Sequence, residues 1–164
     1  MRRLNWISFV TCAMMIAPGL LGAAEPLPPE LTGSWRILRI LPTRNVTCWD
    51  EKQARTVLGT TLSYSPSVML WRSREFRLQG IDTRELTADE FLQETGHGQY
   101  YADFAQLGIH RKSVTEVTLK HKDADITGSS VEMPGDNVLL AGRNRIIVSA
   151  CNVCYEAVRI TTTR

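Results

Sequence analysis

The chain of 164 residues carries 19 lysine and arginine residues against 17 acidic residues, a formal net charge of +2. Arg2 and Arg3 lie in a segment that we expect to be removed, which leaves equal numbers of positive and negative charges. Nucleic-acid binding normally needs an excess of positive charge to displace counterions from phosphates, so nucleic acid is excluded as an expected partner. The remaining part, roughly 140 residues, suffices for one domain with a single core.

The start of the chain has the order of a secretory signal peptide. Arg2 and Arg3 precede an apolar run from Ile7 to Leu21, and the small residues 22–24 come directly before Glu25. The apolar run is too short to span a bilayer comfortably, so we expect no transmembrane segment in the mature chain. The mature protein is expected to begin at Glu25 and to be periplasmic or secreted.

The expected organisation has three parts. Residues 1–24 are the signal peptide, the proline-rich residues 25–32 form an extended leader, and residues 33–164 form a single β-rich domain.

The first half of that domain alternates between strand and helix patterns. Residues 33–41 alternate apolar and polar side chains and predict a strand. Residues 50–59 begin with acidic side chains and end at a glycine, which predicts a short helix. Residues 60–73 predict two strands, or one bent strand, around Ser65-Pro66, and residues 75–81 predict another strand.

The second half predicts one further helix and then strands. Thr87 and Glu90 have the spacing of a capping box and open a short helix that ends at Gly96. Residues 100–108 are compatible with a third helical turn. The later strand patterns cover residues 113–121, 137–142, 145–149 and 154–161. Six to eight short strands with two or three short helices predict a mainly β fold, an antiparallel barrel or sandwich.

A family resemblance enters at the first strand. Gly33, Ser34 and Trp35 follow the leader, and this G-x-W pattern resembles the signature that opens lipocalins and related calycin barrels. In that family an arginine near the end of the last strand packs on the signature tryptophan, and Arg159 stands at the matching position; the central Thr-Asp-Tyr motif of the family is absent. The resemblance implies a closed barrel in which Trp35 is buried beneath Arg159. The layout is also similar to that of small exported bacterial proteins without an assigned role.

Three cysteines remain after removal of the signal peptide: Cys48, Cys151 and Cys154. In an oxidising compartment they predict one disulfide and one thiol. If the last strand pairs with the first, Leu41 lies near Cys154 and Cys48 is only a short loop away. A disulfide between Cys48 and Cys154 is therefore the preferred pairing, and Cys48 with Cys151 or Cys151 with Cys154 are the alternatives.

The CxxC spacing of Cys151 and Cys154 permits two further interpretations, redox chemistry and metal binding. A thioredoxin-type motif places its first cysteine at a helix N-terminus, whereas the residues after Cys154 have a strand pattern. A zinc site needs a second pair of ligands, and the chain offers only Cys48 and scattered histidines. We therefore predict a hairpin with the motif at its tip, and neither a metal nor a cofactor.

These patterns predict an exported, non-enzymatic binding protein without catalytic residues. The first hypothesis is a protein partner, as for an inhibitor or immunity-type module. The second is a small apolar ligand inside a lipocalin-like barrel, where the residues assigned to ligand contact or to the core are Trp35, Trp71, Phe76, Tyr155 and Arg159. The third is a thiol-dependent enzyme that uses Cys151 and Cys154. His97, between two glycines and close to two tyrosines, marks a candidate loop site.

Overall fold

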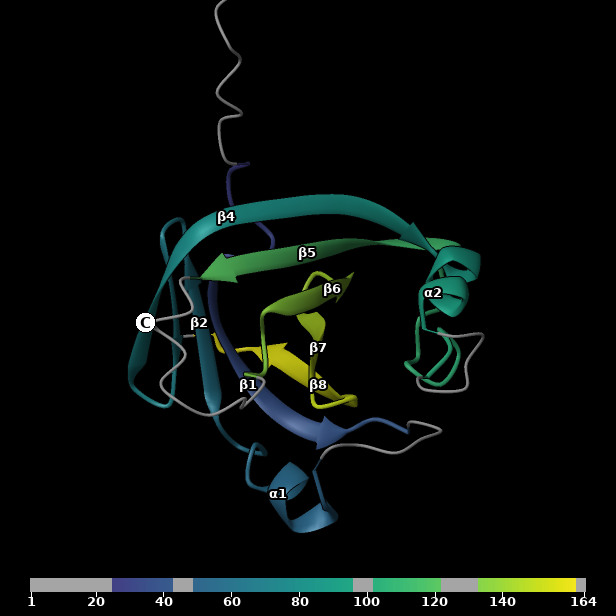
Figure 1. Ribbon diagram of the computed structural model, residues 1–164, viewed down its shortest axis with the longest axis horizontal. Coiled ribbons are helices and arrows are strands. Elements are labelled where there is room, and N and C mark those ends of the chain that lie inside the picture. Colours follow the sequence, from purple (N-terminus) through teal and green to yellow (C-terminus); the bar gives the residue numbers. More distant parts are fainter. Residues whose placement is uncertain (1–24, 43–48, 96–101, 122–132, 162–164) are drawn as a thin grey trace, which may run out of the picture.

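The computed structural model describes residues 25–42, 49–95, 102–121 and 133–161 (Figure 1). Within them, eight antiparallel strands form a closed barrel, in which each strand pairs with the next and the last pairs with the first. The predicted mainly β fold is confirmed, and the barrel, rather than the sandwich, is the observed form.

The described residues hold two α-helices besides the strands. The elements in chain order are β1 (Gly33–Ile40), α1 (Glu51–Arg55), β2 (Thr61–Ser65), β3 (Val68–Trp71), β4 (Arg74–Thr87), α2 (Ala88–Glu94), β5 (Ser113–His121), β6 (Asn137–Gly142), β7 (Arg145–Ala150) and β8 (Val153–Arg159). The segment around Ser65-Pro66 forms two strands, not one bent strand. The strand predicted over residues 75–81 is part of a longer strand, β4.

The barrel closes in the register that the sequence predicts. Trp35 of β1 stands opposite Arg159 of β8, and the backbone N–H of Leu41 donates to the carbonyl of Cys154 at 2.8 Å. A bulge in β1 between Ile37 and Arg39 interrupts the pairing. Closure gives both β1 and β8 a neighbour on either side, so neither is left as an open edge.

Both helices begin with capping boxes. At α2, Thr87 Oγ1 accepts the N–H of Glu90 and the Glu90 carboxylate accepts the N–H of Thr87, as predicted. At α1, Asp50 and Gln53 form the same reciprocal pair, and the helix ends earlier than predicted, at Arg55. The predicted end of α2 at Gly96 lies outside the described residues.

The third predicted helical turn is observed only as hydrogen-bonded turns. The N–H of Leu107 donates to the carbonyl of Asp103 at 3.0 Å, and Gly108 then takes a φ of +66°, a conformation that ends the turn. The described residues 102–109 pack their apolar side chains against the outside of the barrel.

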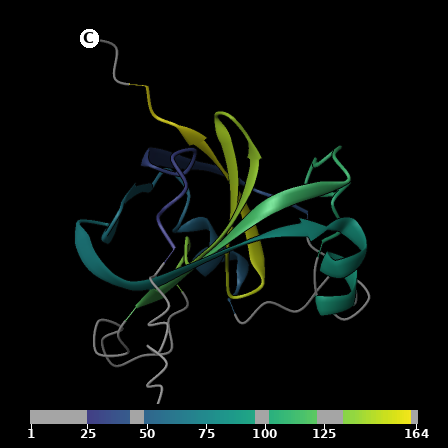
Figure 2. The ribbon, with the colours of Figure 1, turned by 90° about the horizontal axis from the view of Figure 1, so that it is seen from above.

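The buried apolar side chains of the described residues form two clusters. The inner one fills the barrel and includes Trp35, Phe76 and Tyr155. The outer one lies between the barrel wall and the segment formed by α2 and residues 102–109, and includes Phe91 and Phe104, whose ring centroids are 5.3 Å apart. Figure 2 shows α2 at the end of β4, to one side of the barrel. No helix within the described ranges is long and apolar enough to cross a membrane.

Candidate functional site

The predicted contact between Trp35 and Arg159 holds the leader on the barrel. Trp35 is fully buried, and the Arg159 guanidinium lies 4.2 Å from the centroid of its ring. The indole N–H donates to the carbonyl of Leu31 at 2.8 Å. Arg159 also donates to the carbonyls of Thr32, at 2.7 Å, and of Glu30. One tryptophan and one arginine thus fix the path of the chain into β1.

Gly33 is required at this position for two reasons. Its φ is +118°, which side chains rarely tolerate, and a Cβ there would lie 3.0 Å from Arg159 Nη1. The glycine of the G-x-W pattern therefore makes room for the arginine that covers the tryptophan.

The aromatic residues assigned to ligand contact or to the core are core residues. Trp35, Phe76 and Tyr155 are among the largest fully buried side chains, and Trp71 belongs to the same cluster. The Tyr155 hydroxyl donates to the carbonyl of Ala54 at 3.2 Å, which ties α1 to the barrel, and burial raises the pKa of this phenol well above its usual range. Their side chains fill the interior of the barrel.

The CxxC motif lies at the tip of the β7–β8 hairpin, as predicted. Ala150 pairs with Val153, so Cys151 and Asn152 form a two-residue turn, with φ values of 53° and 60°. Positive φ at both positions is the signature of a type I′ turn. The first cysteine therefore sits in a hairpin turn and not at the N-terminus of a helix.

The preference for Cys154 as the disulfide-bonded cysteine is wrong. Cys151 is disulfide-bonded, whereas Cys154 holds a buried thiol, and no disulfide joins the two. The reason lies in the alternation of β8: Val153 and Tyr155 belong to the inner cluster, so Cys154 faces outward into the other cluster. Cys48 lies outside the described residues, and its pairing with Cys151, the predicted alternative, stays a prediction.

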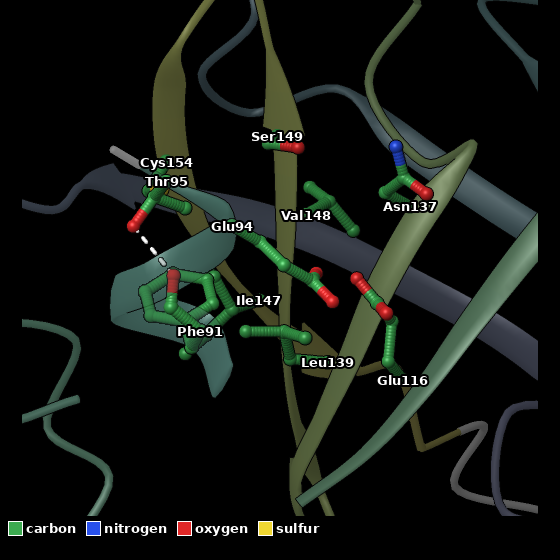
Figure 3. A pocket seen from close by; sticks show the side chains of 10 residues that line it. All are labelled: Phe91, Glu94, Thr95, Glu116, Asn137, Leu139, Ile147, Val148, Ser149 and Cys154. Atoms are coloured by element: carbon green, nitrogen blue, oxygen red, sulfur yellow. Dashed lines mark hydrogen bonds between the residues drawn. The ribbon is translucent and has the colours of Figure 1, made fainter. Parts of the chain in front are cut away.

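A cavity of about 120 Å³ lies where Cys154 faces outward, between α2 and the outer face of the barrel (Figure 3). Phe91, Leu139 and Ile147 supply apolar lining. The carboxylates of Glu94 and Glu116 point toward one another across it. The pocket thus combines an apolar floor with acidic groups that come from a helix and a strand.

Arg84 of β4 holds these two carboxylates. Its Nη1 and Nη2 contact the two Glu94 oxygens at 2.6 and 2.5 Å, and its Nε contacts Glu116 Oε2 at 2.5 Å. The Arg84 guanidinium lowers the pKa of Glu94, and both carboxylates raise the pKa of Arg84. One cation between two anions fastens α2 to β4 and β5 and leaves the group with one net negative charge.

A larger cavity, about 550 Å³, opens at the ends of β4, β5 and β6. Its wall is formed by the inward side of these strands together with the leader, and the lining residues are Pro28, Glu30, Thr83, Glu85, Arg111, Ser113, Val114, Thr115, Leu140, Gly142 and Arg143. We call it the mouth cavity. Its volume falls within the range of small-molecule sites, and seven of its eleven lining residues are charged or bear a hydroxyl.

Two polar contacts shape the mouth cavity. The N–H of Thr83 donates to the Glu25 carboxylate at 2.8 Å, so the leader is also fixed to β4. The Ser113 hydroxyl donates to the Glu85 carboxylate. Thr83 Oγ1, by contrast, is buried without a hydrogen-bond partner among the described residues.

A hydrogen bond between a buried histidine and an aspartate lies at the other end of β5. His121 Nε2 and Asp136 Oδ1 are 2.7 Å apart, the His121 side chain is 3% exposed, and its ring contacts Phe76 edge-on with centroids 5.9 Å apart. Nearby, the Tyr64 hydroxyl donates to the carbonyl of Gly135 at 3.2 Å, and burial raises the pKa of Tyr64. This group packs the end of the barrel where β6 begins.

Sequence reasoning found Trp35, Arg159 and the cysteine hairpin but missed both cavities. Their polar groups come from segments distant in sequence, and no motif joins Arg84 to Glu116 or Arg111 to Arg143. The candidate loop residue His97 lies outside the described residues. Within the described part of the chain, no three histidine, cysteine or acidic side chains gather as a metal site.

Comparisons with protein-family models, curated proteins and solved structures find no match to this chain.

Proposed function

We propose that the protein is an exported, non-enzymatic binding protein that engages a protein partner, as an inhibitor or immunity-type module does. The observation that carries the proposal is the filled interior: the four aromatic residues that would line a ligand site in a hollow barrel pack together in the inner cluster. The solvent-accessible recesses lie instead at the mouth and on the outer wall. Recognition is therefore assigned to the surface of the barrel.

The chemistry of these recesses supports a polypeptide as partner. The mouth cavity combines two glutamates, two arginines and three hydroxyl-bearing side chains with a few apolar residues. Such a mixture suits the main chain and charged side chains of a protein segment better than a small apolar molecule, which needs a mostly apolar pocket.

The lipocalin-like relationship belongs to the same proposal. It is supported by the closed eight-stranded barrel and by the packing of Arg159 on Trp35. In this view the chain keeps the architecture of a ligand-carrying barrel but uses it as a solid scaffold.

Two measurements on the full-length chain, expressed in its host with a C-terminal tag, test the proposal. The intact mass of the exported product is expected to begin at Glu25. Native mass spectrometry of the gently purified product is expected to show a stoichiometric protein complex. A product that carries a small apolar molecule and no protein, together with saturable uptake of palmitic acid in a fluorescence competition assay, would contradict the proposal and favour the ligand carrier.

A further inference from the structure

We propose that the cavity between α2 and the outer face of the barrel, here called the wall pocket, receives the side chain of one lysine of the protein partner. The inference rests on the proposed function and names the kind of residue that anchors the partner. Three features of the wall pocket carry it: its size, its apolar floor and the negative charge at its opening.

The wall pocket has the size of one unbranched side chain. Its volume is about 120 Å³. A water molecule takes up about 30 Å³ in the liquid, so the pocket has room for roughly four or five heavy atoms. A lysine side chain is a four-carbon stem that ends in one compact ammonium group, whereas arginine ends in a larger planar fork. The volume therefore suits lysine better than arginine.

The floor of the wall pocket is apolar. Phe91 of α2, Leu139 of β6 and Ile147 of β7 line it and are buried, and Cys154 of β8 lies beside them in the same outer cluster. A lysine stem can pack along such a surface while its charged end stays near solvent. The floor thus accounts for the stem, and the opening has to account for the ammonium group.

The charged groups of the wall pocket are negative. Among the described residues that line it, the two charged ones are Glu94 and Glu116, whose carboxylates point toward one another (Figure 3). Arg84 binds both and leaves the three groups with one net negative charge. The hydrogen bond from Arg84 lowers the pKa of Glu94, and Glu90, one turn earlier in α2, opposes this shift as a like charge. The surroundings of the opening therefore attract a cation and repel a carboxylate.

The two carboxylates can accept more hydrogen bonds than Arg84 donates. A carboxylate has about four lone-pair sites. Arg84 uses both oxygens of Glu94 but only Oε2 of Glu116, and Glu116 Oε1 has no hydrogen-bond partner among the described residues. The Glu116 side chain is 17% exposed, against 47% for Glu94. An ammonium group at Glu116 would form a charge-assisted hydrogen bond that water screens less than a bond at the open surface.

Four small probes separate the contribution of the stem from that of the charge. Butylammonium has both, 1-butanol lacks the charge, methylammonium lacks most of the stem and butyrate carries the opposite charge. In NMR titrations of the chain from residue 25 onward, butylammonium is expected to bind with a Kd on the order of 1–10 mM and to shift the methyl signals of Leu139 and Ile147. 1-Butanol and methylammonium should bind at least about fivefold more weakly, and butyrate should not bind. This comparison uses unchanged protein and does not depend on the folding of any variant.

Charge variants test the two carboxylates. The double variant Glu94→Gln/Glu116→Gln is expected to weaken butylammonium about tenfold and to leave 1-butanol within about twofold, because it removes the charge and keeps the floor. Glu75→Gln is the matched control. Glu75 of β4 is also an exposed glutamate in an ion pair with an arginine, Arg77, at 3.7 Å, but it does not line the pocket. Its affinity for butylammonium should stay within about twofold of the wild type.

A cross-linker without a spacer tests for the lysine in the native complex. A carbodiimide joins a carboxylate to an amine in direct contact as an amide, with loss of water. In the complex isolated from the host, it is expected to join Glu94 or Glu116 to a lysine of the partner. The double variant should reduce the yield of the complex about tenfold or more, as expected for an anchor residue at the centre of an interface.

The inference is overturned if butylammonium binds no better than 1-butanol or methylammonium, or if the double variant binds it as well as Glu75→Gln does. It is also overturned if the native complex forms unchanged in the double variant. That last result leaves the proposed function standing, since a protein partner is still bound, at another surface. A wild-type product without any protein partner would refute the proposed function, and the lysine anchor with it, whatever the probes show.

Discussion

Replacement of Trp35 by alanine is the most direct test of how the chain closes its barrel. Trp35 is fully buried, its N–H donates to the carbonyl of Leu31, and Arg159 covers its ring. Truncation of a buried tryptophan typically costs about 3–5 kcal/mol of unfolding free energy, because burial is lost and a cavity is left. The lost contact with the guanidinium adds about 0.5–2 kcal/mol, part of which the truncation value already contains.

We therefore expect Trp35→Ala to lower the free energy of unfolding by about 4 kcal/mol, a large part of the roughly 5–15 kcal/mol typical of a domain. Trp35→Phe is the matched control. It keeps a buried ring beneath Arg159 but loses the hydrogen bond to Leu31 and some volume, so about 1–2 kcal/mol is expected.

The measurement is urea unfolding of the chain from residue 25 onward, with its disulfide intact, followed by far-ultraviolet circular dichroism. Tryptophan fluorescence is unsuitable as the only probe, because the substitution removes one of its sources. If Trp35→Ala unfolds within about 0.5 kcal/mol of the wild type, Trp35 is not a core residue and the closure argument fails. Equal losses in Trp35→Ala and Trp35→Phe would mean that the hydrogen bond, and not burial, supplies the stability.

Three further predictions address the Arg84 ion pairs, the cysteine hairpin and the buried Tyr64. Arg84→Gln should lower the unfolding free energy by about 0.5–1 kcal/mol at neutral pH in urea unfolding, a small cost because the ion pairs are partly exposed. Since the pKa of Glu94 is lowered below 4.5, the stability advantage of the wild type should be lost as pH falls through that lowered pKa. An advantage that grows in acid would contradict the assignment of the ion pair. Cys151→Ala should cost about 2–5 kcal/mol of unfolding free energy, and Cys154→Ala less than about 1.5 kcal/mol. Non-reducing peptide mapping should find Cys151 cross-linked and Cys154 alkylated only after unfolding, and the reverse pattern would refute the assignment of the disulfide to Cys151. Tyr64 has a raised pKa, so its contribution to stability should be present below about pH 10 and be lost as pH rises toward the pKa of the folded protein. The unfolding free energy of Tyr64→Phe should therefore fall less steeply in alkali than that of the wild type. Identical pH profiles would count against the burial of this phenol.

The parts of the fold that the sequence predicts are those set by local patterns. Thr87 and Glu90 meet within one helical turn, so their spacing alone predicts the start of α2. The alternation in residues 33–41 and in the C-terminal segments predicts strands, and pairing of the last strand with the first brings Leu41 to Cys154. The G-x-W pattern adds a second long-range contact that could be anticipated, Arg159 on Trp35.

The errors have tertiary causes. Strand β4 extends to Thr87, beyond its predicted end at residue 81, because its polar residues pair with β5 along that length. The wrong choice between the two cysteines followed from the register, which brings Leu41 to Cys154 but does not show which way the Cys154 side chain faces. A type I′ turn places Cys151 at the tip, while the alternation of β8 turns Cys154 away from the interior. Neither the turn type nor the facing of Cys154 can be read from the spacing of two cysteines.

The candidate site was missed because its groups meet only in space. Arg84, Glu94 and Glu116 stand on three elements, and their arrangement depends on how α2 folds back over the β4–β5 pair. The mouth cavity depends on a feature with no sequence signature, the divergence of β6 from β5 after Leu139.

That divergence has a visible origin in β6. The pairing of β6 with β7 is irregular between Leu139 and Gly142, so β6 is displaced where its pairing with β5 ends. An open strand edge normally invites unwanted pairing with other chains, and natural proteins limit this with charged side chains. Arg111 and Lys112 precede this edge and are exposed, and Glu85 lies beside it on β4. The charged side chains at the rim of the mouth cavity therefore limit pairing with an apolar strand of another chain.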